Sequence, residues 1–129
     1  SDAAIDAHVE HGPRVPVVNS TMHLYPINGA AQRFGPDDAA WGHRDANFAP
    51  VIAGMWPDPA DNVANTAWVK EYYAATAPHS EEGAYVNFMD ADDRDRVRAS
   101  YGPSYDRLVE VKRQYDPDNL FRHNQNIAP

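Results

Sequence analysis

The last third of the chain, residues 85–129, constrains the fold most, because glycine and prolines divide it into short elements. Residues 85–89 alternate as a β-strand does, which places Val86 and Phe88 on a core face. The opposite face then carries the side chains of Tyr85, Asn87 and Met89. A phenol and an amide that point the same way need hydrogen-bond partners. We therefore predict that this face has hydrogen-bond partners elsewhere.

Two helices and an irregular tail follow this strand. The aspartates within residues 90–93 suit a helix N-terminus, and that helix should run to about Tyr101, before Gly102. A second helix should begin near Pro103 and end before Pro117. The remaining residues mix apolar anchors with polar donors, a composition that is typical of a tail that lines a site.

These pieces, in this order, resemble the C-terminal signature of the berberine-bridge-enzyme-like family of FAD-linked oxidases. The matching pieces are Tyr85-x-Asn87, Tyr101-Gly102, Arg107-Leu108 with Lys112, Tyr115-Asp116-Pro117-x-Asn119-x-Phe121-Arg122, and Asn124-Gln125-x-Ile127-x-Pro129. A weaker resemblance continues upstream to about Pro16.

The resemblance implies a longer polypeptide with an N-terminal FAD-binding domain, which would be the missing partner of this chain. Residues 1–84 would form part of the substrate-binding domain, and residues 85–129 would be the segment that returns to the flavin. The cofactor of the longer protein would be FAD, and we do not expect this chain to bind it alone. We also expect the isolated chain to self-associate, because the polar and aromatic face that bears Tyr85 and the tail from Leu120 would be uncovered.

Upstream, the pattern predicts an α+β fold. Helices are expected at 2–10 and at 63–77, and strands at 17–25, 30–34, 48–56 and 85–89. We therefore predict an antiparallel sheet of about four strands with helices packed on one face. His8 and His11 lie three residues apart near the end of the first helix. They are more simply read as cations at a helix C-terminus than as metal ligands, so we predict no metal site.

Composition excludes several function classes. The net charge is -8, with only 11 Lys and Arg residues, which argues against nucleic acid and anionic membrane surfaces. The chain has no cysteine, so it has no disulfide and no thiolate nucleophile. No apolar run approaches about 18 residues, so the sequence predicts a soluble protein, with the cytoplasmic and the secreted compartment both open.

The resemblance also implies roles for single residues. Tyr85 would be the base that takes a proton from the substrate, although it could instead only hold the substrate or the flavin by a hydrogen bond. Asn87, Asn124 and Gln125 would contact the flavin or organise the tail. His23 and Tyr25 share a strand face and would contact the substrate, unless Leu24 on the other face does so.

The expected function is therefore the oxidation of a small organic substrate, such as an alcohol, a sugar or an alkaloid-like compound. Two alternatives from other classes stay open. The chain could be a non-catalytic fragment, or a small binding or assembly module that holds no FAD.

Overall fold

In the computed structural model, which describes residues 1–35, 38–89 and 96–129, the chain divides into two compact units. The first unit comprises residues 1–25 and 48–81, and the second comprises residues 26–47 and 82–129. Helices and strands are both present, so the predicted α+β class is confirmed. None of the helices in the described ranges combines the length and the hydropathy that a membrane span requires.

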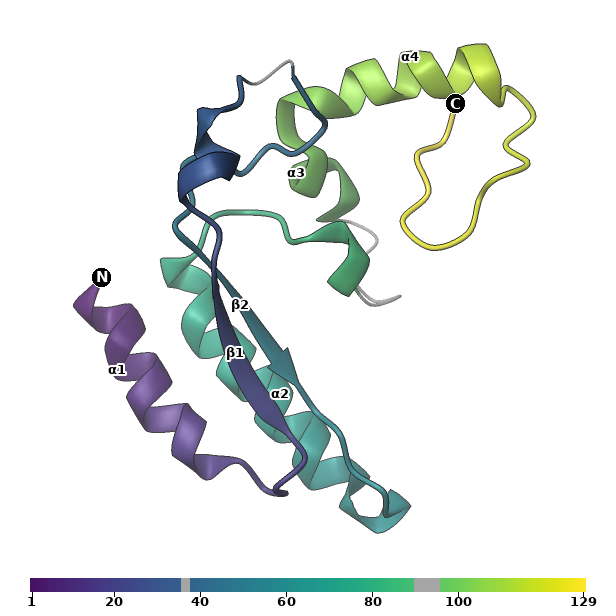
Figure 1. The fold of residues 1–129 in the computed structure, drawn as a ribbon. Helices are drawn as coiled ribbons and strands as arrows, with labels where there is room; N and C mark the ends of the chain where they lie inside the picture. The colour runs from purple at the N-terminus through teal and green to yellow at the C-terminus, as the bar shows by residue number, and fades with distance from the viewer. Residues whose placement is uncertain (36–37, 90–95) are drawn as a thin grey trace. The chain divides into compact units, whose positions relative to one another are not determined.

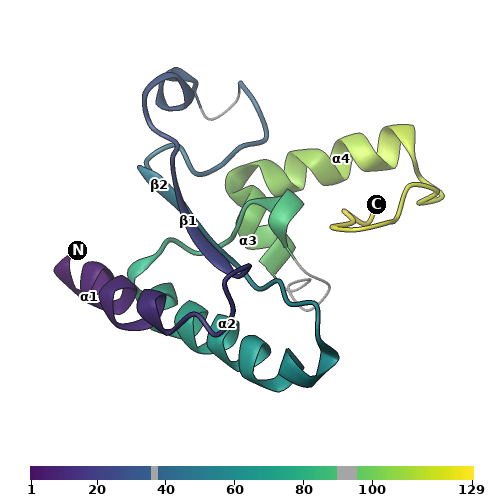
Figure 2. The ribbon, with the colours of Figure 1, turned by 60° about the horizontal axis from the view of Figure 1, so that its bottom comes forward.

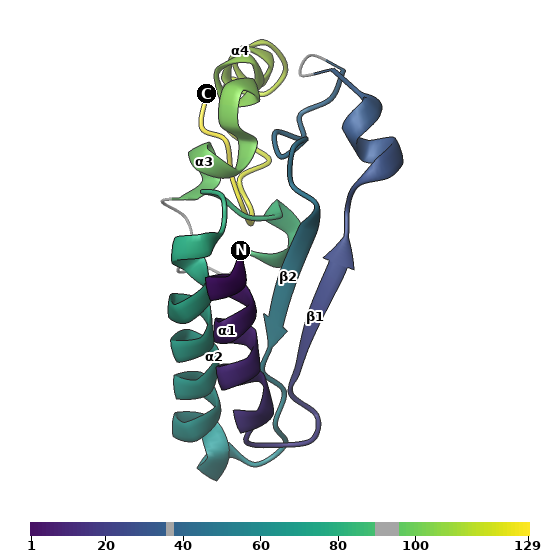
Figure 3. The same ribbon diagram turned by 90° about the vertical axis from the view of Figure 1, so that its left-hand side faces the viewer.

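The first unit is a two-stranded antiparallel sheet covered by two helices (Figure 1). Its elements are α1 (Asp2–His11), β1 (Thr21–Pro26), β2 (Phe48–Ala53) and α2 (Asn62–Thr76). Two views show α1 and α2 on the same side of the sheet (Figures 2 and 3). The prediction that helices cover one face is therefore confirmed for this unit, whereas the sheet has two described strands rather than about four.

The core of the first unit is one stripe of α2. The buried side chains on this helix are those of Asn65, Trp68, Tyr72 and Thr76, which recur every three or four residues. Asn65 is a fully buried amide, and it is satisfied because its Nδ2 donates to the carbonyl of Asp61 at 2.9 Å. The side chain of Ser20 donates to Asn65 Oδ1 at 3.4 Å, so the turn before β1 is fixed to α2.

The second unit contains α3 (Val97–Tyr101), α4 (Tyr105–Tyr115) and the C-terminal tail. Gly102 ends α3 with a φ of 53°, a conformation that favours glycine, so the predicted helix stop is confirmed. The predicted N-cap at residues 90–93 lies outside the described residues.

Two predicted strands are wrong. Residues Val86–Phe88 form a 3₁₀ turn, in which side chains three apart eclipse, rather than a strand with period two. Phe88, predicted to be core, is 61% exposed, whereas Met89 is 8% exposed. The predicted strand at 30–34 is also a 3₁₀ turn, Gly29–Arg33, and Gly29 begins it with a φ of 73°.

Candidate functional site

Tyr85 lies in the second unit between two aromatic side chains. The centroid of its ring is 5.6 Å from that of Trp41 and 5.2 Å from that of Phe88. The contact with Phe88 follows from the 3₁₀ turn, because residues i and i+3 of such a turn lie above one another. Trp41 is itself fixed, since its Nε1 donates to the carbonyl of His43 at 3.1 Å. The phenol ring therefore has a defined orientation.

The hydroxyl of Tyr85 is held by Asn87. The amide Nδ2 of Asn87 donates to Tyr85 Oη at 2.7 Å, and both side chains are exposed. The predicted strand is absent, yet the turn still brings the predicted phenol and amide together. A hydroxyl that accepts from Asn87 keeps its own proton available for another acceptor.

Gln125 and Asn124 occupy different environments in the tail. The side chain of Gln125 donates to the carbonyl of Met89 at 2.7 Å, so it ties the tail to the end of the turn that carries Tyr85 and Asn87. Asn124 is exposed and has a left-handed backbone, with a φ of 58°. It borders a hollow of about 300 Å³, whose other lining residues are Val97, Asn119, Arg122 and Asn126. Of the two tail residues, Gln125 organises the structure and Asn124 faces solvent.

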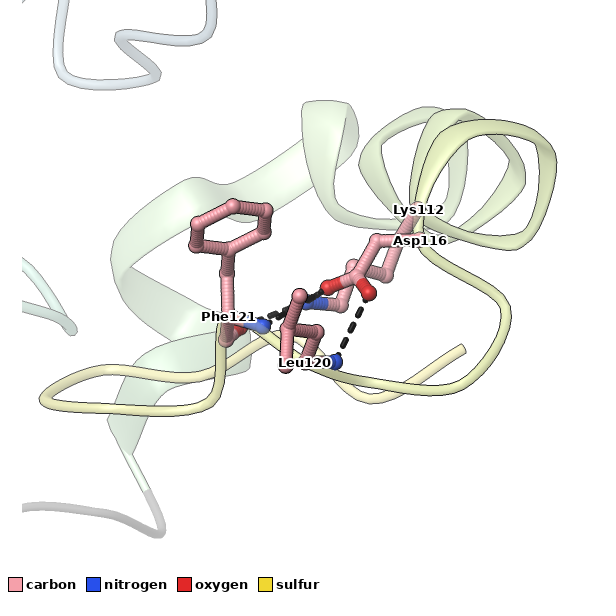
Figure 4. A network of polar contacts seen from close by, with 4 residues as sticks. All are labelled: Lys112, Asp116, Leu120 and Phe121. Atoms are coloured by element: carbon pink, nitrogen blue, oxygen red, sulfur yellow. Dashed lines mark hydrogen bonds and ion pairs between the residues drawn. The ribbon is translucent and has the colours of Figure 1, made fainter.

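Four residues form a tail clamp that the sequence did not reveal: Lys112, Asp116, Leu120 and Phe121 (Figure 4). The carboxylate of Asp116 accepts from the backbone N–H of Leu120 at 2.7 Å and from that of Phe121 at 3.0 Å. The Nζ of Lys112 pairs with Asp116 and donates to the carbonyl of Phe121 at 2.6 Å. The clamp therefore fixes the backbone that follows the Pro117 turn. Its sequence signal is a lysine and an aspartate four residues apart, directly before that proline.

The charge of Asp116 makes the clamp depend on pH. The hydrogen bond from Lys112 and the two backbone donors lower the pKa of Asp116 below its ordinary value. A pKa lowered from 3.8 in the folded chain means that the stabilisation is present above that value and is lost as pH falls through the folded value.

We expect the amide protons of Leu120 and Phe121 to lose protection from exchange by about tenfold or more in Asp116→Ala. Asp116→Asn is the matched control, because it keeps one acceptor oxygen and the size of the side chain, and its loss should be smaller. Amide exchange measured by NMR from pH 3 to pH 6 checks both variants. Equal protection in wild type and Asp116→Ala would show that the clamp does not hold the tail.

His23 and Tyr25 lie in the first unit, on β1. Their rings are stacked with centroids 5.7 Å apart and planes 7° apart, and His23 Nε2 forms a 2.8 Å hydrogen bond with Thr21 Oγ1. Met22 and Leu24 point the other way, since both line a groove against α1. The structure therefore pairs His23 with Tyr25 on the sheet face that the helices leave open.

The groove between α1 and β1 has a volume of about 440 Å³. Its lining is apolar except for His8, and it comprises Ile5, His8, Val9, Pro13, Met22 and Leu24. His8 Nδ1 and the hydroxyl of Tyr72 form a hydrogen bond of 2.8 Å, so this histidine has a structural partner. In the part of the chain that the structure describes, no three His, Asp or Glu side chains are grouped to hold a metal.

Comparison with known proteins gives one family and a consistent set of relatives. Residues 84–128 match the family model "Berberine and berberine like". The chain is 33% identical over 127 residues to an uncharacterized FAD-linked oxidoreductase, YgaK of Bacillus subtilis, covering 98% of this chain and 27% of that protein. The chain thus spans about a quarter of the length of such relatives.

Solved structures share the fold. The BBE-like 1 protein of Physcomitrella patens is 26% identical, with a TM-score of 0.82 over 98% of this chain and 27% of that one. The glycopeptide hexose oxidase DBV29, solved in complex with teicoplanin, is 25% identical, with a TM-score of 0.82 over 100% of this chain and 30% of that one.

Proposed function

We propose that this chain, which belongs to the berberine-bridge-enzyme-like family of FAD-linked oxidoreductases, serves in the flavin-dependent oxidation of a small organic substrate. The observation that carries the proposal is the Tyr85 hydroxyl, which is exposed, oriented by Trp41 and Phe88, and hydrogen-bonded to Asn87. Bound FAD would accept the hydride, which is chemistry that no side chain of this chain supplies.

Tyr85 would act in the proton transfer that accompanies hydride transfer. After its own proton has passed to solvent, the phenolate oxygen would take the proton of a substrate hydroxyl, while the amide of Asn87 donates to that oxygen.

The residues present suit a flavin next to this turn. Asn87 and Asn124 carry exposed amides, which can match the alternating donors and acceptors of a flavin's polar edge. Gln125 would act through the tail, because it binds the carbonyl of Met89. We propose Asn87 and Asn124 as cofactor contacts and Gln125 as a positioning residue for the tail.

Substrate contact is proposed for His23 and Tyr25, whose stacked rings form a flat polar-aromatic surface on the open face of β1. Such a surface suits a ring with hydroxyl groups. The relative DBV29 is described as a glycopeptide hexose oxidase, which favours a sugar over a simple alcohol or an alkaloid-like compound.

Residues 1–84 would then belong to a substrate-binding domain, and residues 85–129 would be the segment that returns to the flavin. A second candidate function is a binding or assembly module without flavin. Self-association of the isolated chain fits either function.

A chimera can distinguish flavin-dependent oxidation from a binding or assembly module. We expect the isolated chain to carry well under one FAD per chain. We expect YgaK whose aligned region is replaced by this chain to carry about one FAD per chain, because the flavin-binding part is then present. Absorbance after gel filtration gives both ratios, and anaerobic bleaching by a panel of sugars and alcohols reports the reaction. A folded chimera that carries flavin but is bleached by no member of the panel, while native YgaK is bleached, would favour the binding module.

A further inference from the structure

Leu120 and Phe121 form an apolar anchor on a rigid backbone. Their side chains are 70% and 77% exposed, although both backbone N–H groups and the carbonyl of Phe121 are held by the tail clamp (Figure 4). Exposed apolar side chains usually lie on backbone that is free to move or are isolated on a surface. An anchor whose backbone is already ordered loses less entropy when it binds.

The groove between α1 and β1 in the first unit offers a complementary surface. Ile5 and Val9 line it from the helix and Leu24 lines it from the strand, and all three side chains are about half exposed or more. Its volume of about 440 Å³ is of the size that accepts small apolar groups. Nothing in the described part of the first unit covers these three side chains.

Charge favours the same pairing. Asp2, Asp6 and Glu10 are spaced by four residues along α1. Glu10 is already ion-paired with Arg14 at 3.0 Å, so Asp2 and Asp6 carry the remaining acidic charge of this stripe. At 100° per residue this stripe borders the face that carries Val9. In the other unit, Arg122 directly follows the anchor and Arg113 lies seven residues before it, and neither forms an ion pair with a described residue. These two arginines outnumber Asp118, the acidic residue two positions before the anchor. An acidic rim around the groove and basic residues around the anchor are complementary.

We propose that the chain self-associates head to tail, with the Leu120–Phe121 anchor of one copy inserted into the α1–β1 groove of a second copy. The contact joins two different surfaces, so it is heterologous and can propagate into larger assemblies or close into a ring. This differs from association through the face that carries Tyr85, which would pair like with like. The inference does not depend on FAD.

Two variants separate the two halves of the contact. Leu120→Ser/Phe121→Ser removes the anchor but keeps the backbone atoms of the clamp. Val9→Gln/Leu24→Thr removes the apolar lining of the groove while keeping residues suited to a helix and a strand. Val18→Ser is the matched control, because Val18 is 92% exposed and lies outside the groove and the anchor. Circular dichroism verifies that each variant folds.

Sedimentation velocity over a concentration series of the full chain gives the result. We expect wild type and Val18→Ser to form species larger than the monomer. Each double variant should associate at least about 30-fold more weakly, the loss typical of truncating the central residues of a contact. A mixture of the two double variants should form a dimer and stop there, because each variant retains only one half of the contact. Raising the salt concentration should weaken association without abolishing it.

Three outcomes would overturn the proposal. Wild type could sediment as a monomer at all concentrations, or the mixture of the two double variants could stay monomeric. Both double variants could also associate like wild type while Tyr85→Ser becomes monomeric, which would assign association to the aromatic face of the second unit.

Discussion

We expect Tyr85→Phe, which lacks the proposed base, to slow flavin reduction by about 10²- to 10⁴-fold in an enzyme that joins this chain to a flavin-binding domain. The substitution removes one hydroxyl and keeps the ring, so the contacts with Trp41 and Phe88 are preserved. A base acts in the transition state, so substrate binding should weaken far less than the rate. The rate should also lose one ionisation from its pH profile, because the variant has no phenol to deprotonate.

Anaerobic stopped-flow reduction of the chimera across pH measures both effects. Tyr25→Phe is the matched control, since it removes the same hydroxyl from β1, where we propose substrate contact, and its effect should fall mainly on apparent affinity. The reduction rate of Asn87→Ala should lie between those of Tyr85→Phe and Tyr25→Phe, because this variant keeps the Tyr85 phenol but removes the amide that donates to it. A reduction rate of Tyr85→Phe within about threefold of the parent at saturating substrate would leave Tyr85 with a binding role only.

The helices were predictable because their signals are local and repeated. The expected helix at 63–77 is observed as Asn62–Thr76, where buried side chains recur every three or four residues. Gly102 was read correctly as a stop, since its φ of 53° is one that glycine adopts readily. Such features depend on neighbouring residues and not on distant parts of the chain.

The strands were harder to predict from sequence, because five residues of alternating polarity fit a turn as well as a strand. Residues 85–89 were assigned by period two, and the structure places a 3₁₀ turn at their centre. Nothing within so short a segment reports whether another strand lies beside it, which is what defines a strand. The same reason explains the error at 30–34.

The site was predictable in part. Tyr85 and Asn87 were expected to point the same way and are hydrogen-bonded, although by a different backbone path. The tail clamp was missed because its acceptors are filled by the backbone N–H groups of Leu120 and Phe121. Backbone donors carry no sequence signal, and the chain reverses between Asp116 and these residues through Asn119, whose φ is 52°.

Tyr72→Ala should lower the free energy of unfolding of the first unit by about 3–5 kcal/mol, the cost typical of deleting a large buried aromatic side chain. Tyr72 is 0% exposed, and its ring contacts those of Trp68, His8 and His11 at centroid distances between 5.5 and 5.7 Å. No residue of α1 is itself buried, and the Tyr72 ring and the 3.0 Å hydrogen bond from Trp68 Nε1 to the His11 carbonyl both join α1 to α2. Urea denaturation followed by circular dichroism measures the loss, and partial loss of helix before unfolding would report release of α1.

Tyr72→Phe separates the hydroxyl from the ring. It removes the hydrogen bond to His8 and should cost about 0.5–1.5 kcal/mol at neutral pH. Burial raises the pKa of Tyr72, so the folded chain keeps this phenol neutral where the unfolded chain ionises it. Its stabilisation is therefore complete below the unfolded value of about 10 and is lost as pH rises above it. Wild type should lose stability there more steeply than Tyr72→Phe, and parallel curves for the two proteins would show that Tyr72 is not buried as the structure places it.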